Sequence, residues 1–105
     1  MIEVNDQRVD FFSTRLRQKL PNAIRRIILF GSRARGDAHE GSDYDFAVIC
    51  QTRDAATKQA VREVEVEFLN RFDTLSSSLV FDENGWERRK NLPIRLNIEK
   101  EGILL

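Results

Sequence analysis

Two short apolar runs constrain the fold of this chain more than any other feature of its sequence. Residues 27–30 form the first run and residues 46–49 the second, and neither alternates between apolar and polar residues. Strands that are covered on both faces have this character, so we predict central strands over 24–30 and 44–50. Residues 31–42 between them contain several glycines and polar residues, which predicts a loop with room for one helical turn.

The segments around these strands have the periodicity of helices. Apolar residues at every third or fourth position predict an N-terminal helix that Asn5 caps and that ends at Pro21. A second apolar stripe predicts a helix over 52–72. A weaker strand is predicted over 75–81.

The C-terminal region predicts two further helices. Asp82 can cap the first, near Trp86, and Pro93 suits the first turn of the second. Gly102 would end that helix as a glycine C-cap, with Ile103 in the hydrophobic contact that accompanies such caps. This order of elements predicts an α/β (α+β) fold, in which helices flank a small mixed sheet of three or four strands. The loop between the first two strands leaves their relative direction open.

Composition favours one globular domain over residues 1–105. Of the 105 residues, 41% are hydrophobic and 32% are charged. Lysine plus arginine and aspartate plus glutamate both total 17, and this zero net charge argues against direct nucleic-acid binding. No apolar stretch reaches the ~20 residues of a membrane span. Cys50 is the only cysteine and no signal peptide is recognisable, so we expect a cytoplasmic protein without a membrane partner.

Residues with phosphate-binding chemistry follow the first apolar run. Gly31 lets backbone N–H groups approach a phosphate closely, and the Ser32 hydroxyl adds a donor. The amides of a helical turn here would point at the same anion. Arg33 and Arg35 are candidate guanidinium contacts to a polyphosphate. The loop is not a Walker P-loop, because Asp37 stands where that motif requires lysine.

An acidic pair, Asp43 and Asp45, begins the second strand. Residues i and i+2 of a strand project from the same face, so these carboxylates should lie close together, with Tyr44 and Phe46 in the core on the opposite face. Such a pair repels itself unless a cation lies between the two groups or one is protonated. Oxygen ligands beside a phosphate site favour Mg²⁺ or Mn²⁺, and an aspartate pair can hold two metals for phosphoryl-type transfer.

Together these two motifs resemble the signature of the polymerase-β-like nucleotidyltransferase superfamily. The signature is glycine-serine, a loop of about ten residues and an Asp-x-Asp pair, and the match is dense over residues 30–48. The form Gly-Ser-Arg-Ala-Arg-Gly at 31–36, with Ser-Asp-Tyr-Asp-Phe at 42–46, is similar to the minimal nucleotidyltransferases (MNT). These are the antitoxin halves of HEPN/MNT toxin–antitoxin pairs. Residues 97–102 also resemble a common C-terminal ending of this group.

The resemblance implies a function as well as a fold. Asp43 and Asp45 would ligate Mg²⁺, and ATP would be the substrate. The expected activity is transfer of AMP to a tyrosine of a partner HEPN ribonuclease, which silences that toxin. The implied nucleotide-binding residues are Gly31, Ser32, Arg33, Arg35 and Ser42.

The third carboxylate of the superfamily has no obvious counterpart here. The strand predicted over 75–81 carries serines where we would look for an acid, with Asp73 before it and Asp82 after it. Asp73 is the better candidate, because a strand that rises about 3.3 Å per residue carries Asp82 far away. It would act as general base or complete a metal site.

Without a third carboxylate, the alternative is a weak or inactive nucleotide-binding module that neutralises a toxin by binding alone. Apolar residues that so small a domain leaves unburied would suit a partner protein or a homodimer. The residues expected in this role are Phe11, Val66 and Leu69.

Overall fold

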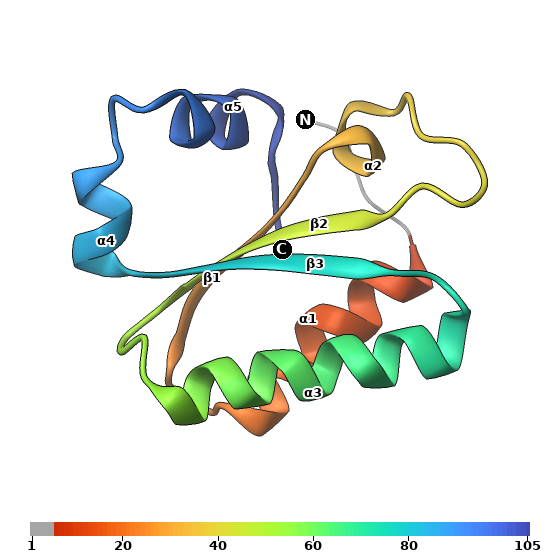
Figure 1. Cartoon of the computed structure of the whole chain (residues 1–105), viewed down its shortest axis with the longest axis horizontal. Coiled ribbons are helices and arrows are strands. Elements are labelled where there is room, and N and C mark those ends of the chain that lie inside the picture. Colours follow the sequence, from red (N-terminus) through yellow and green to blue (C-terminus); the bar gives the residue numbers. More distant parts are fainter. Residues whose placement is uncertain (1–5) are drawn as a thin grey trace.

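A four-stranded sheet organises the computed structural model, which describes residues 6–105. The strand order is β3-β2-β1-β4, and Figure 1 shows how the strands lie between the helices. β2 runs antiparallel to β1 and parallel to β3, and β4 is antiparallel to β1. The predicted mixed sheet is therefore confirmed, and the first two strands are antiparallel. The strands are β1 (Ile24–Phe30), β2 (Tyr44–Cys50), β3 (Ser76–Asp82) and β4 (Ile103–Leu104).

Helices cover both faces of the sheet. α1 and α3 pack side by side on one face, and α4 and α5 lie on the other (Figure 1). The short helix α2 lies at the end of β1, where Ala34 joins the cluster on the α1 and α3 face. Within residues 6–105, no helix combines the length and the apolar character that crossing a membrane requires. The helices are α1 (Gln7–Lys19), α2 (Ser32–Arg35), α3 (Ala55–Phe72), α4 (Glu83–Arg88) and α5 (Pro93–Glu101).

Strand β2 supplies side chains to two hydrophobic clusters. Tyr44 and Phe46 face α1 and α3 and are fully buried, as predicted. Ala47 and Ile49 face α4 and α5 in the second cluster. Both faces of this strand are therefore buried, which explains why its sequence does not alternate. Because side chains alternate along a strand, Asp45 shares the face of Ala47.

Side-chain caps set the ends of several helices. Asp6 caps α1, where its Oδ1 accepts the Arg8 N–H at 2.9 Å; the predicted cap, Asn5, lies outside the described residues. Asp54 accepts the Thr57 N–H at 2.8 Å, so α3 begins at Ala55 and not at residue 52. Asp82 caps α4 as predicted, where it accepts the Gly85 N–H at 2.6 Å.

The end of α5 differs from the prediction. Gly102 is its C-cap, but its φ of −72° is not the left-handed conformation of a glycine C-cap. Glycine is needed here for space, since a Cβ would lie 2.2 Å from the Ile98 carbonyl oxygen and 2.5 Å from Ile28 Cγ2. Ile103 then enters the sheet opposite Leu29 and does not fold back on the helix. The close packing of Gly102 between α5 and β1 brings Glu101, the last residue of α5, to the end of β1.

Candidate nucleotide and metal site

Gly31 and Asp45 make direct contact where β1 ends. Phe30 pairs with Asp45 across the strands, so the backbone of Gly31 passes over the carboxylate of Asp45. A Cβ on Gly31 would lie 2.4 Å from Asp45 Oδ2, and Gly31 has φ 77°. Both the space and the backbone conformation require glycine. The predicted phosphate-binding residue and a predicted metal ligand are thus brought together.

The one-turn helix α2 follows Gly31 and gives its two arginines different surroundings. Arg33 donates from Nε and Nη2 to the Ser42 carbonyl oxygen, at 3.2 and 2.9 Å, and its guanidinium lies 4.5 Å from the centre of the Tyr44 ring. Arg33 therefore ties the two ends of the loop together. Ser42 helps to shape the same loop, because its Oγ accepts the His39 N–H at 3.1 Å. The structure gives Arg33 and Ser42 structural contacts, and their role in binding nucleotide stays a prediction.

Arg35 points instead toward the carboxylates of the site. Its Nη1 lies 3.0 Å from Glu101 Oε2, and its Nε lies 3.1 Å from Asp37 Oδ2. Hydrogen bonds to Glu101 and then to Asp37 raise the pKa of Arg35. Ser32 is half-buried at the start of α2, next to Gly31. Arg35 and Ser32 therefore border the contact between Gly31 and Asp45.

The acidic pair lies at the mouth of β2. Asp43 is exposed just before the strand, and Asp45 is half-buried within it. Burial raises the pKa of Asp45, and the nearby charges of Asp43 and Glu101 raise it further, whereas Arg35 opposes the shift. A cation between the two carboxylates would offset this repulsion. The oxygen-only donor set fits Mg²⁺ or Mn²⁺, with water and phosphate oxygens as the remaining ligands.

Asp73 is not brought to the acidic pair. It is the C-cap of α3, with φ 51°, and its backbone N–H donates to the Leu69 carbonyl at 2.9 Å. Ser77 occupies the position on β3 in register with Asp45. Across residues 6–105, no three His, Cys, Asp or Glu side chains gather in a group that could hold a metal ion. Asp73 therefore does not complete a three-residue metal group with the acidic pair, and its role as general base stays a prediction.

Glu101 is a site residue that sequence reasoning missed. Its Oε1 accepts the Gly31 N–H at 3.0 Å while Oε2 pairs with Arg35. The pairing of β4 with β1 positions it, since Ile103 lies opposite Leu29. The only signal in the sequence was the C-terminal ending over 97–102, which did not indicate where this segment lies. The carboxylate of Glu101 thus contacts the donors that were predicted to bind phosphate.

Comparison with known proteins agrees with this site. The family model described as "Polymerase beta, Nucleotidyltransferase" matches residues 14–105. A Methanocaldococcus jannaschii protein with the name "Putative protein adenylyltransferase" is 29% identical over 94 residues, which cover 90% of each chain. This similarity and the family match support the predicted nucleotidyltransferase activity.

Two solved structures share the fold. A chain from a toxin–antitoxin crystal structure with AMP-PNP is 23% identical, with TM-score 0.61, over 96% of this chain and 72% of that chain. A chain from a complex of tri-AMPylated Shewanella oneidensis HEPN toxin with an MNT antitoxin is 19% identical, with TM-score 0.52, over 93% and 71%. At these identities the likeness concerns the fold, and it confirms the predicted nucleotidyltransferase-like architecture.

Proposed function

Because the chain belongs to the polymerase β nucleotidyltransferase family, we propose that it transfers AMP from ATP, with Mg²⁺ or Mn²⁺, to a tyrosine of a partner HEPN toxin. This transfer would make it an antitoxin that acts in the cytoplasm. The observation that carries the proposal is the contact between Gly31 and Asp45. It supports the proposal because it brings the turn expected to bind phosphate and a carboxylate expected to bind metal within reach of one nucleotide.

Different residues of the site would bind the phosphates and the metal in such a transfer. Gly31 and Ser32 would hold phosphate oxygens with an N–H and a hydroxyl, and Arg35 would neutralise part of their charge. Asp43 and Asp45 would hold Mg²⁺, which when bound supplies the positive charge that phosphate groups require. The acceptor hydroxyl would attack the α-phosphorus and lose its proton to water, while the bond from the α-phosphorus to the bridging oxygen breaks and pyrophosphate leaves. Catalysis of this kind rests on positioning the reactants.

The names of the relatives support the choice of acceptor. The Methanocaldococcus relative is named for protein adenylylation, and the Shewanella complex holds a HEPN toxin that carries AMP. A toxin–antitoxin structure of the same fold contains the ATP analogue AMP-PNP. We extend these descriptions to this chain because the residues of the motif are present in it.

A binding module without turnover is the second candidate. Two observations favour it: Ser77 replaces a carboxylate beside Asp45, and Glu101 occupies the Gly31 N–H. In this case the chain would neutralise the toxin by covering it. Val66 and Leu69 are 57% and 39% exposed, as expected for an interface, whereas Phe11 packs against Phe72. The same exposed side chains would serve a homodimer.

Label transfer separates the two candidates. Purified HEPN-type partner is incubated with Mg²⁺ and ATP labelled at its α-phosphate, using wild type, Asp43→Asn/Asp45→Asn and the matched loop control Glu40→Gln. The proposal expects label on the partner with wild type and Glu40→Gln, and none with the double variant. A stable complex that gains no label with wild type would favour the binding module.

A further inference from the structure

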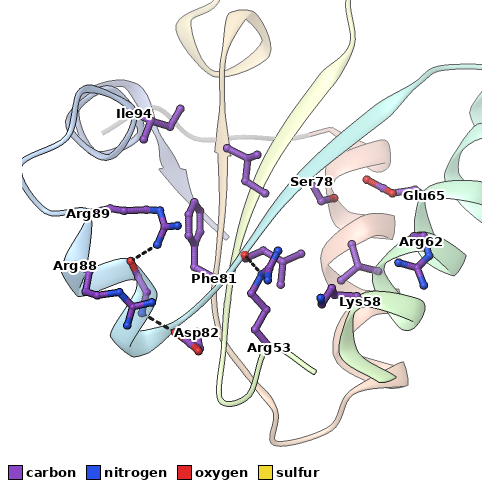
Figure 2. A pocket seen from close by; sticks show the side chains of 14 residues that line it. Arg53, Lys58, Arg62, Glu65, Ser78, Phe81, Asp82, Arg88, Arg89 and Ile94 are labelled. Atoms are coloured by element: carbon purple, nitrogen blue, oxygen red, sulfur yellow. Dashed lines mark hydrogen bonds between the residues drawn. The ribbon is translucent and has the colours of Figure 1, made fainter. Parts of the chain in front are cut away.

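A groove of about 680 Å³ lies along β3, which is an edge strand of the sheet. α3 forms one wall and α4 the other, with the side chain of Phe81 between them (Figure 2). The proposed transfer makes no use of this groove. Five basic side chains line it against two acidic ones, Glu65 and Asp82; the basic residues are Arg53, Lys58, Arg62, Arg88 and Arg89.

The groove carries more positive than negative charge, although Arg62 lies near the charge of Glu65 and Lys58 near that of Asp54. None of the five basic side chains forms an ion pair within the part of the chain that the structure describes, although ion pairs engage cations elsewhere on the molecule, such as Lys19 and Arg95. Asp82 is occupied as the cap of α4. Glu65 lies at the Ser78 end of the groove (Figure 2). In a chain with zero net charge, this local excess indicates an anionic occupant.

The backbone of β3 can pair with another strand. The Tyr44 N–H donates to the Leu75 carbonyl at 3.0 Å, so that carbonyl faces β2. Carbonyls alternate in direction along a strand, and the Val80 carbonyl accordingly faces the groove, where Arg53 Nε donates to it at 2.8 Å. Such an edge is a template for an added strand. By this alternation, the backbone groups that face outward belong to Ser76, Ser78 and Val80. An added strand would take the place of Arg53 at the Val80 carbonyl, which releases that guanidinium for an acidic side chain of the segment.

Apolar side chains also line the groove, and their exposure favours a peptide over a nucleic acid as the ligand. Leu79 and Ile94 are 40% and 39% exposed, and alternate residues of an extended segment could cover them. Phe81, in contrast, is 9% exposed and lies under the guanidinium of Arg89, so it offers no platform for a nucleic-acid base. A second copy that docked through this same edge would bring the same positive charge to it and be repelled.

We propose that the groove binds an extended acidic segment of the acceptor protein, as an additional strand on β3. That the segment belongs to the acceptor rests on the proposed function, whereas its acidic, extended character rests on the groove alone. Ser77 is in register with Asp45, and Val80 lies about 10 Å further along the strand. A segment on this edge therefore leads toward the acidic pair and would guide a nearby tyrosine to it.

Binding is tested with a short fluorescent peptide in which glutamate alternates with valine. We expect the peptide to bind and to shift the amide NMR signals of Ser76, Ser78 and Val80. Lys58→Glu/Arg62→Glu should weaken binding roughly tenfold, because it reverses two charges that line the groove from α3. The matched double reversal Arg17→Glu/Arg26→Glu, away from the groove, should leave affinity unchanged, and Glu65→Gln should increase it.

Three results would overturn the proposal. The first is that a lysine–valine peptide binds as tightly as the glutamate–valine peptide. The second is that a single-stranded oligonucleotide binds more tightly than the peptide and shifts the same amide signals. The third is that the peptide binds without shifting the amide signals of β3. The two variants distinguish an error in the proposed peptide binding from an error in the proposed AMP transfer. Asp43→Asn/Asp45→Asn should abolish transfer and keep peptide affinity, whereas Lys58→Glu/Arg62→Glu should raise the KM for the acceptor with kcat retained. Unchanged KM in the latter variant would contradict the groove and leave the transfer intact.

Discussion

Glu101 Oε1 accepts a hydrogen bond from the Gly31 N–H at 3.0 Å, although 70 residues separate the two in sequence. The same carboxylate pairs with Arg35 and raises the pKa of Asp45. A carboxylate in this position resembles a phosphate in charge and in the donors it engages. Nucleotide and Glu101 are therefore expected to compete for the same N–H and guanidinium.

Glu101→Gln should strengthen nucleotide binding about three- to tenfold. The substitution keeps an oxygen acceptor for Gly31 but removes a negative charge near the phosphate site. Calorimetric titration with a non-hydrolysable ATP analogue and Mg²⁺ measures the effect, and Glu99→Gln in the same helix is the control. Weaker binding in Glu101→Gln would mean that the carboxylate holds Gly31 in place for the nucleotide and does not compete with it.

Gly31→Ala should destabilise the fold by about 1–3 kcal/mol and weaken metal binding. Its φ of 77° strains any other residue, and the new Cβ would displace the carboxylate of Asp45. Gly36→Ala is the matched control, because Gly36 has φ 85° but nothing within 4 Å of the added Cβ. Urea unfolding and Mn²⁺ titration are measured on both. Equal metal affinity in the two variants would argue against the close approach to Asp45.

The central strands were predictable because local sequence determines them. The apolar run of β1 ends at Gly31, and both predicted strands have the bounds that the structure shows. The position of Glu101 was not predictable, since it depends on the short strand β4 pairing with β1. Arg33 and Arg35 look equivalent in sequence, yet the single turn of α2 directs one to the loop and the other to Glu101.

The contribution of Asp45 to the stability of the protein should fall as pH rises through the titration of this group. Burial, with the charge of Asp43, raises the pKa of Asp45 above 3.8, so the native state holds this proton more tightly than the unfolded chain. Between 3.8 and the raised native pKa, Asp45 holds more protons in the native state than in the unfolded chain, so its contribution to the free energy of unfolding decreases with pH. Urea unfolding of wild type and Asp45→Asn over this range isolates the contribution. A wild-type-minus-variant difference that rises with pH would contradict it.

Ser77→Asp should increase metal affinity about tenfold. Ser77 is exposed, in register with Asp45 and on the same face of the sheet, so an added carboxylate would stand beside the acidic pair. Three carboxylates attract a divalent cation more strongly than two, and the new group could also accept the proton of the attacking hydroxyl. Ser78→Asp on the opposite face is the control, because Ser78 Oγ is buried near the carboxylate of Glu65 and a second negative charge there should only destabilise the fold. Mn²⁺ titration and label transfer are compared across the three proteins. Higher metal affinity with faster transfer would indicate that the missing carboxylate limits the enzyme, whereas unchanged affinity in a folded Ser77→Asp variant would show that this position does not reach the metal.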